Sequence, residues 1–285
     1  MNIKWKEHEK QHMQVRQSGE VVYLAYPALE EIGIVKHGFS TRIGGVSEGI
    51  FSTMNLSFTR GDDRDAVMEN YRRITAALGV DVENIVTSDQ THTTNVRVVT
   101  GKDAGKGILK PRDYKDVDGM VTDVPGLVLA TFYADCVPLF FVDPVKRAIG
   151  LSHSGWRGTV RKMGKVTVET MIRQYGSEPE HILAAIGPSI CQDCYEVSED
   201  VAEAFSGEFP ADEILKKGRK TEEGQKYQLD LWRSNELVML EAGIKPEHIS
   251  RPGICTCCNP DLLFSHRASH GKRGNLGAFL ALDSI

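Results

Sequence analysis

The stretch GLVLATFYADCVPLFFVDPVKRAIGLSHSGWRG, residues 126–158, carries the densest strand pattern in the chain. Short apolar runs at 126–133, 138–142 and 148–152 predict three strands that follow one another closely. Ala134, Asp135 and Cys136 connect the first two runs, and His153 follows the third. This stretch therefore predicts a sheet with polar, reactive side chains where its strands end.

Further strand and helix patterns lie on both sides of this stretch. We expect strands at 21–26, 33–40, 95–100, 181–186 and 279–282, and helices at 62–79, 159–175, 198–205 and 231–242. The strands do not alternate regularly with helices, which favours an α+β fold of layered mixed sheets over a doubly wound parallel sheet. No repeat or Ser/Pro-rich linker interrupts the chain, so a single domain over 1–285 is expected.

Residues 101–119 lack any apolar period and carry many charged side chains. A loop of this length is typical of a functional lid or of a mobile segment. A solvated surface loop is the other interpretation, and the sequence leaves both open.

Composition narrows the class of protein. The chain has 285 residues, 41% of them hydrophobic and 26% charged, with a net charge of −5. These values are typical of soluble globular proteins and exclude a disordered chain. An acidic chain lacks the basic surface of most nucleic-acid-binding proteins, so no nucleic-acid partner is expected. No run approaches the roughly 20 apolar residues of a membrane span. Residues 1–10 lack the apolar segment of a signal peptide, which predicts a cytoplasmic protein.

Six cysteines lie at positions 136, 191, 194, 255, 257 and 258, and none lies in the first 135 residues. In the cytosol such clustering indicates metal binding or catalysis more often than disulfides. Cys191 and Cys194 have a spacing that suits half of a structural zinc site. Cys255, Cys257 and Cys258 resemble the other half, although they are packed more tightly than the usual Cys-x2-Cys pair. Buried free thiols are the alternative for these five residues.

Three segments place a metal-binding side chain at the end of a predicted strand or just before one. These side chains are His92, Cys136 and His153. Thiolate and imidazole are the ligands that zinc prefers, and three protein ligands leave a fourth position open for catalysis. Their separations match no short zinc motif, so the spacing alone does not establish a site.

A set of short motifs extends this pattern from about residue 37 to about residue 275. In chain order the motifs are Thr41-Arg42-x-Gly44-Gly45-Val46-Ser47, Asn55-Leu56-Ser57, Gly61-Asp62-Asp63, Gln90-x-His92, Ala134-Asp135-Cys136-x-Pro138, His153-x-Gly155-Trp156-Arg157-Gly158, Gly187-Pro188-x-Ile190, Tyr195-Glu196-Val197 and Cys255-Thr256. Together they resemble the YfiH/YlmD-type family, also called polyphenol oxidase or laccase-domain proteins, and its Bacillus-type YlmD branch in particular.

The resemblance implies a single layered domain of α/β/β/α type, related in fold to cysteine-dependent deamidase toxins. It also implies a mononuclear zinc held by His92, Cys136 and His153. The implied activity is that of a purine nucleoside phosphorylase acting on adenosine, inosine and methylthioadenosine, with additional adenosine deaminase activity. Purine nucleosides and phosphate are then the expected partners of a monomer or homodimer.

Several other residues suit this chemistry. Arg42 precedes Gly44 and Gly45, whose backbone amides could form an anion-binding concavity. Arg157 lies in a Gly-flanked turn beside His153, and arginine is suited to bidentate contact with phosphate. Surface salt bridges are the alternative for both arginines.

Two polar residues have candidate roles with a plainer alternative beside each. Asp135 is a candidate general acid or base for deamination at adenine C6, although a role in capping a turn or supporting the ligand Cys136 is the stronger interpretation. Asn55 could contact a ribose hydroxyl or an amide edge, or simply shape a turn.

The chain departs from the family pattern at two places. Thr93 stands where the family commonly has glycine after the ligand histidine, and Ser265-His266-Arg267-Ala268 stands where it often has Ser-Tyr-Arg-Arg. His266 can act as an acid or base near neutral pH, where tyrosine would not. We expect His266 and Arg267 to contact the substrate.

Three rival functions belong to other classes. A copper oxidase agrees with the family's older name, and a Cys/His site also binds Cu²⁺, but the chain has nine histidines and no His-x-His pair. A metal-free cysteine hydrolase would use Cys136 as nucleophile and His153 as base. A non-enzymatic partner protein would leave the arginine and glycine loops without a ligand.

Overall fold

The computed structural model describes residues 2–6 and 13–283. Part of the charged N-terminal stretch on which the cytoplasmic prediction rests, residues 1 and 7–12, lies outside this description. Within the described ranges, no helix is both long enough and apolar enough to span a bilayer.

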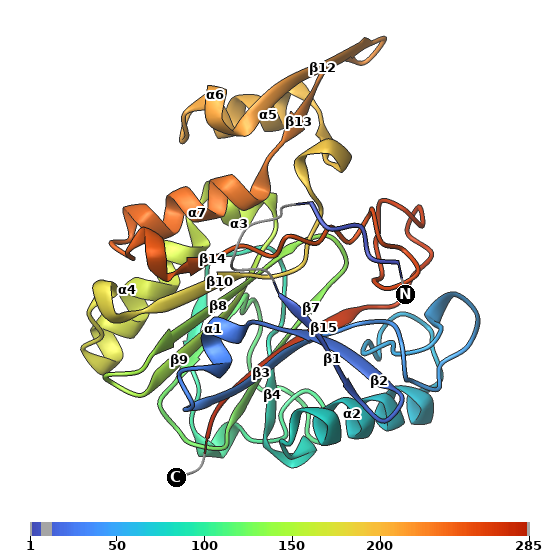
Figure 1. Cartoon of the computed structure of the whole chain (residues 1–285), viewed down its shortest axis with the longest axis vertical. Helices are drawn as coiled ribbons and strands as arrows, with labels where there is room; N and C mark the ends of the chain where they lie inside the picture. Colours follow the sequence, from blue (N-terminus) through green and yellow to red (C-terminus); the bar gives the residue numbers. More distant parts are fainter. Residues whose placement is uncertain (1, 7–12, 284–285) are drawn as a thin grey trace.

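Two six-stranded mixed sheets form the centre of the molecule (Figure 1). The first sheet has the order β1-β2-β3-β15-β7-β4. Its strands are β1 (Gln14–Ser18), β2 (Val21–Ala25), β3 (Val35–Ser40), β15 (Leu276–Leu282), β7 (Val128–Tyr133) and β4 (Ile85–Thr87). All neighbours are antiparallel except β4 and β7.

The second sheet has the order β14-β10-β8-β9-β6-β5. Its strands are β14 (Ile249–Ser250), β10 (Leu183–Ile186), β8 (Val137–Asp143), β9 (Ala148–Ser154), β6 (Gly119–Thr122) and β5 (Val96–Val98). A small third sheet, β11 (Glu196–Val197), β13 (Gly224–Leu229) and β12 (Leu215–Thr221), projects from one end with α5 and α6 (Figure 1).

The three longest helices, α2, α4 and α7, cover the outer faces of the two large sheets. The helices are α1 (Pro27–Glu30), α2 (Arg64–Leu78), α3 (Trp156–Val160), α4 (Met163–Tyr175), α5 (Glu199–Ser206), α6 (Ala211–Ile214) and α7 (Leu231–Glu241). Helix α2 packs Val67 and Ile74 against Val128 and Phe279 of the first sheet. Helices α4 and α7 share a core cluster with the second sheet. This arrangement is the predicted layered α/β/β/α architecture.

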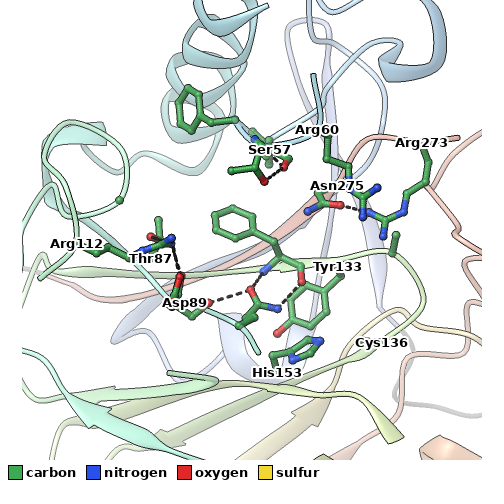
Figure 2. Close-up of a pocket in the computed structure, with 18 of the residues that line it drawn as sticks. Ser57, Arg60, Thr87, Asp89, Arg112, Tyr133, Cys136, His153, Arg273 and Asn275 are labelled. Atoms are coloured by element: carbon green, nitrogen blue, oxygen red, sulfur yellow. Dashed lines mark hydrogen bonds and ion pairs between the residues drawn. The ribbon is translucent and has the colours of Figure 1, made fainter. Parts of the chain in front are cut away.

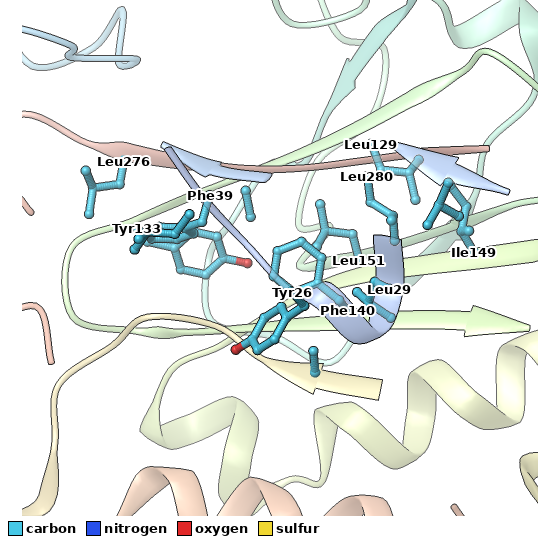
Figure 3. Packing of buried hydrophobic residues seen from close by; sticks show 14 of the residues in the cluster. Tyr26, Leu29, Phe39, Leu129, Tyr133, Phe140, Ile149, Leu151, Leu276 and Leu280 are labelled. Atoms are coloured by element: carbon cyan, nitrogen blue, oxygen red, sulfur yellow. The ribbon is translucent and has the colours of Figure 1, made fainter. Parts of the chain in front are cut away.

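The main core lies between the two sheets (Figure 3). Strand β8 is buried along its whole length, because Phe140 and Val142 face the other sheet while Leu139 and Phe141 face the helices. Strands covered on both faces read as continuous apolar runs, which explains why 126–158 carried so clear a strand pattern.

The structure corrects three expectations about elements. The helix expected at 159–175 is two helices, α3 and α4, separated at Lys162, whose φ of 60° is left-handed. The strand expected at 279–282 starts at Leu276 and lies between β3 and β7, inside its sheet. Strands β12 and β13 were not expected at all, because their residues are mostly polar and only partly buried.

The charged segment 101–118 packs against the first sheet. The buried Asp103 accepts hydrogen bonds from Lys106 Nζ (2.8 Å) and Arg97 (3.1 Å). Gly107 approaches Thr87 so closely that an added Cβ would lie 1.8 Å from its hydroxyl oxygen. These contacts hold the segment over the end of β4, and it helps to line the cavity described below.

A buried histidine in β3 makes the fold sensitive to acid. His37 Nε2 accepts the Tyr26 backbone N–H at 2.8 Å, and burial lowers the pKa of this imidazole to about 4. Because protonation favours the unfolded chain, stability is complete above the ordinary pKa near 6.5 and falls as the pH drops towards 4.

We therefore expect His37→Gln to remove part of the acid sensitivity of the free energy of unfolding. Between pH 7.5 and pH 4 the wild type should lose about 3 kcal/mol more than the variant. Urea unfolding at both pH values, followed by circular dichroism, measures this difference. Equal losses in the two proteins would contradict the assignment.

Candidate active site

The candidate site lies where the chain passes from one large sheet to the other. Strand β7 belongs to the first sheet and β8 to the second, and the connection between them contains Cys136. His153, near the end of β9, pairs with Pro138 at the start of β8. His92 lies in the loop that follows β4. Three separate strand ends therefore contribute one side chain each.

His92, Cys136 and His153 form a group that could hold a metal ion. One ligand atom from each lies within 4.8 Å of the other two. The two imidazole rings meet edge to face, with centroids 5.0 Å apart. Gly155 leaves room for this group, because a Cβ there would lie 2.8 Å from a His92 ring carbon and 3.2 Å from the Cys136 sulfur. We refer to these three residues as the His/Cys triad.

A buried carboxylate, Asp118, holds the triad in place. It accepts hydrogen bonds from the backbone amides of Thr91, His92 and Thr93 (2.9–3.1 Å), and His153 Nδ1 lies 2.7 Å from its Oδ1. His92 needs this support because its φ of 64° is unusual for a residue with a side chain. A carboxylate on one imidazole nitrogen directs the other towards a metal. Sequence analysis missed Asp118, because it lies in the charged segment 101–119, where no strand was expected to follow it.

The triad is electrostatically coupled. Burial opposes ionisation of Cys136, but the charges and hydrogen bonds of His153 and His92 lower the pKa of its thiol to about 6. Burial likewise opposes protonation of His153, but Cys136 and Asp118 raise the pKa of its imidazole to about 9. Both shifts favour the thiolate–imidazolium form of the metal-free pair at neutral pH.

The triad opens into a cavity of about 440 Å³, a size typical of small-molecule sites. Figure 2 shows part of its lining. The lining comes from the loop before α2, helix α2, the end of β4 and the loop after it, the segment 101–118, the end of β7 and the connection to β8, the end of β9 and the loop before β15. Its residues are Leu56, Ser57, Phe58, Thr59, Arg60, Tyr71, Thr87, Ser88, Asp89, Gln90, His92, Gly107, Arg112, Phe132, Tyr133, Ala134, Cys136, His153, Arg273 and Asn275.

Three arginines line this cavity, and sequence analysis singled out none of them. Arg112 is neutralised by Asp89, with Nη2 and Oδ1 2.8 Å apart. Arg60 and Arg273 lie side by side (Figure 2), and no carboxylate in the described ranges forms an ion pair with either. The Arg273 Nε is buried without a hydrogen-bond partner, and burial together with the Arg60 charge lowers the pKa of Arg273 to about 10. Two adjacent cations in a cavity favour an anionic ligand.

The structure places Arg42, Gly44 and Gly45 around a different hollow. The Arg42 guanidinium donates to the carbonyls of Ser52 (2.7 Å) and Pro260 (2.8 Å). The Gly45 amide donates to Thr53 Oγ1 at 3.0 Å. The predicted anion-binding group of Arg42, Gly44 and Gly45 therefore does not form part of the cavity at the triad. The two glycines are required by close backbone packing, since a Cβ at Gly44 would lie 2.4 Å from a carbonyl oxygen of Glu20.

Asn55 and Asp135 also have roles inside the protein. Asn55 is fully buried, and its side-chain amide bonds Ser57, Asp62 and the backbone of Asn275. This corrects the predicted substrate contact in favour of the turn.

The Asp135 carboxylate accepts from Thr256 Oγ1 (2.6 Å) and from the Arg267 amide (2.7 Å). Both carboxylate oxygens are therefore bonded, and Asp135 supports the turn before Cys136. These contacts favour the supporting role of Asp135 over the candidate acid/base role.

The other three predicted site residues lie near the triad but do not line its cavity. Arg157 is exposed and stacks on the Trp156 ring at 4.3 Å. Arg267 donates to the carbonyls of Cys194 and Glu196. His266 is exposed, and burial and the charge of Arg273 lower its pKa. Their predicted contacts with substrate stay predictions.

Comparison with known proteins shows the family to which this chain belongs. The profile of the family described as multi-copper polyphenol oxidoreductase laccase matches residues 36–283. The chain belongs to this family. The expected resemblance to YfiH/YlmD-type proteins is thereby confirmed.

Relatives of this family member carry enzyme names, in agreement with the prediction of an enzyme. It is 39% identical over 249 residues to purine nucleoside phosphorylase YlmD of Bacillus subtilis, covering 86% of this chain and 87% of that protein. It is 36% identical to adenosine deaminase RL5 of an unknown prokaryotic organism, covering 80% and 87%. The crystal structure of YlmD from Geobacillus stearothermophilus superposes with a TM-score of 0.86 at 33% identity, covering 96% and 100%.

We expect Asp118→Asn to weaken metal binding at the triad roughly 10- to 100-fold, because it loosens the His92 turn and the His153 imidazole. Competition with a chromogenic zinc chelator at pH 7.5 measures the change. Asp116→Asn is the matched control, since this exposed carboxylate bonds only Thr91 Oγ1 of the same turn. Wild-type affinity in Asp118→Asn would refute the positioning role.

Proposed function

We propose that the protein is a zinc-dependent purine nucleoside phosphorylase. It takes adenosine, inosine or methylthioadenosine with phosphate, and releases the free base and the pentose 1-phosphate. One observation carries this proposal: the His/Cys triad lines the same cavity as Arg60 and Arg273. These two arginines lie side by side, and neither forms an ion pair with a carboxylate of the described residues. The names of the relatives supply the class of substrate.

The donor set suits zinc. His92, Cys136 and His153 would hold the ion at the wall of the cavity, and zinc would supply Lewis-acid polarisation of a substrate oxygen there. Multicopper oxidases need many clustered histidines, whereas this group has two histidines and one cysteine. We therefore assign zinc rather than a copper oxidase centre, although Cu²⁺ can bind the same donors.

The chain's own residues would position both substrates. Arg60 and Arg273 hold the phosphate, whose oxygen forms the new bond to the anomeric carbon as the bond from that carbon to the base breaks. Phe58 and Phe132 offer apolar surface to the planar base. Gln90 fixes the Phe132 backbone, accepting its N–H and donating to its carbonyl at 2.7 Å each.

Adenosine deaminase activity accompanies phosphorolysis in this proposal, supported by the name of one relative. Purified enzyme is incubated with adenosine with and without phosphate, and products are separated by chromatography. Adenine released only with phosphate supports the phosphorylase. Inosine formed at the same rate in both samples, with no adenine, would make the enzyme a deaminase instead.

A second candidate is a cysteine hydrolase. Cys136, His153 and Asp118 have the order of nucleophile, base and orienting carboxylate, and the pKa of the thiol is lowered towards that of a nucleophile. This function needs the metal-free protein. Activity that survives chelators and is lost on thiol alkylation would favour it over the phosphorylase.

We expect Arg273→Gln to raise the KM for phosphate roughly ten- to a hundredfold, because it removes a charged hydrogen-bond donor to the anion. The KM for adenosine should change far less. Arg72→Gln, an exposed arginine of α2, is the control and should leave both constants unchanged. Steady-state kinetics with each substrate varied in turn gives both KM values for the wild type and the two variants, and equal effects of Arg273→Gln on both substrates would contradict the phosphate role.

A further inference from the structure

Four of the remaining cysteines converge outside the cavity. Cys191 and Cys194 follow β10, and Cys255 and Cys258 follow β14. Their four sulfur atoms all lie within 4.8 Å of one another, with Cys194 and Cys258 3.4 Å apart and Cys191 and Cys258 4.0 Å apart. We call these residues the four-cysteine cluster. None of them lines the cavity of the triad.

The cluster consists of two Cys-x2-Cys pairs. The sequence motif at 255–258 holds three cysteines and looked too tight for zinc, but the structure selects Cys255 and Cys258, which have the usual spacing. Cys257, between them, is not part of the group. The close-packed motif is thus an ordinary pair with one extra thiol.

The dimensions suit one ion. Four thiolates around zinc at about 2.3 Å form a tetrahedron with edges of about 3.8 Å. The Cys194–Cys258 and Cys191–Cys258 sulfur separations of 3.4 and 4.0 Å bracket this edge. We propose that Cys191, Cys194, Cys255 and Cys258 bind a structural zinc ion, separate from the metal of the His/Cys triad.

The surroundings suit a negatively charged tetrathiolate. The Cys191 backbone N–H donates to the Cys255 sulfur at 3.2 Å. The Lys6 ammonium interacts electrostatically with Cys191 and Cys258. Its Nζ also forms an ion pair with Asp193 Oδ2 at 3.0 Å. Amide donors and a nearby cation stabilise the excess charge that four thiolates leave on a zinc site.

The site would brace the active centre. Between the ligands Cys255 and Cys258, Thr256 donates its hydroxyl to Asp135 at 2.6 Å, and Asp135 precedes the triad ligand Cys136. The Thr256 amide also bonds the Ser189 carbonyl at 3.1 Å, which ties the two ligand segments together. Zinc in the cluster therefore fixes the turn that presents Cys136.

The test uses the full chain in two forms, wild type and Cys136→Ser, which disables the triad. Metal analysis by mass spectrometry should find one more zinc per chain than the triad holds, so Cys136→Ser retains one equivalent. After replacement by Co²⁺, this variant should show the intense sulfur-to-cobalt absorption of a tetrahedral tetrathiolate. A Cys136→Ser protein that stays metal-free after incubation with zinc, or that holds iron, would overturn the proposal.

Two further variants, made in the Cys136→Ser background, identify the ligands. Cys258→Ser should lose the remaining zinc, while the matched Cys257→Ser should keep it. Equal zinc content in these two proteins, or a disulfide within the cluster found by peptide mass mapping, would refute the assignment. If Cys258→Ser does not fold, the cobalt spectrum of Cys136→Ser decides alone.

Discussion

A single buried carboxylate holds the site together across two sheets. Asp118 has no exposed surface and receives hydrogen bonds from three successive amides of the His92 turn and from His153. Burying a charge without such partners costs far more free energy than the fold can supply. The turn after β4 in the first sheet and strands β6 and β9 in the second must therefore meet at Asp118, and the three metal-competent donors converge as a consequence.

The two cysteine-containing groups differ in what surrounds them. The triad has three donors and faces a polar cavity, so it suits an ion that exchanges a ligand with substrate. The four-cysteine cluster offers four donors, which would enclose an ion completely, so it suits a structural metal. Thr256 and Asp135 connect them, and the Arg267 side chain bonds the carbonyls of Cys194 and Glu196 while its amide bonds Asp135. The same turn therefore depends on both groups.

Part of this arrangement could be predicted from sequence, because both-face burial leaves continuous apolar runs, and Cys136 and His153 lie where two such runs end. His92 only precedes a predicted strand, and the resemblance to the YfiH/YlmD-type family was needed to join the three residues into one ligand set. Arg60, Arg112 and Arg273 could not be predicted as cavity residues, since an arginine in a loop has the same local pattern whether it faces a cavity or solvent. Arg42 and Asn55 show the converse. Both lie in motifs that the sequence analysis singled out, but their hydrogen bonds hold the fold together. Arg42 bonds Ser52 and Thr53, and Asn55 accepts the Asn275 backbone N–H.

The net charge of the chain does not indicate the local charge of this cavity. The chain carries −5 overall, yet Arg60 and Arg273 are held close enough that their repulsion, added to burial, lowers the pKa of Arg273. Two cations without a carboxylate between them destabilise the ligand-free fold, whereas Arg112 in the same cavity is neutralised by Asp89. An anion bound beside Arg60 and Arg273 would offset this repulsion. Because the fold already holds the two cations together in one cavity, the arrangement is pre-organised for a small anion.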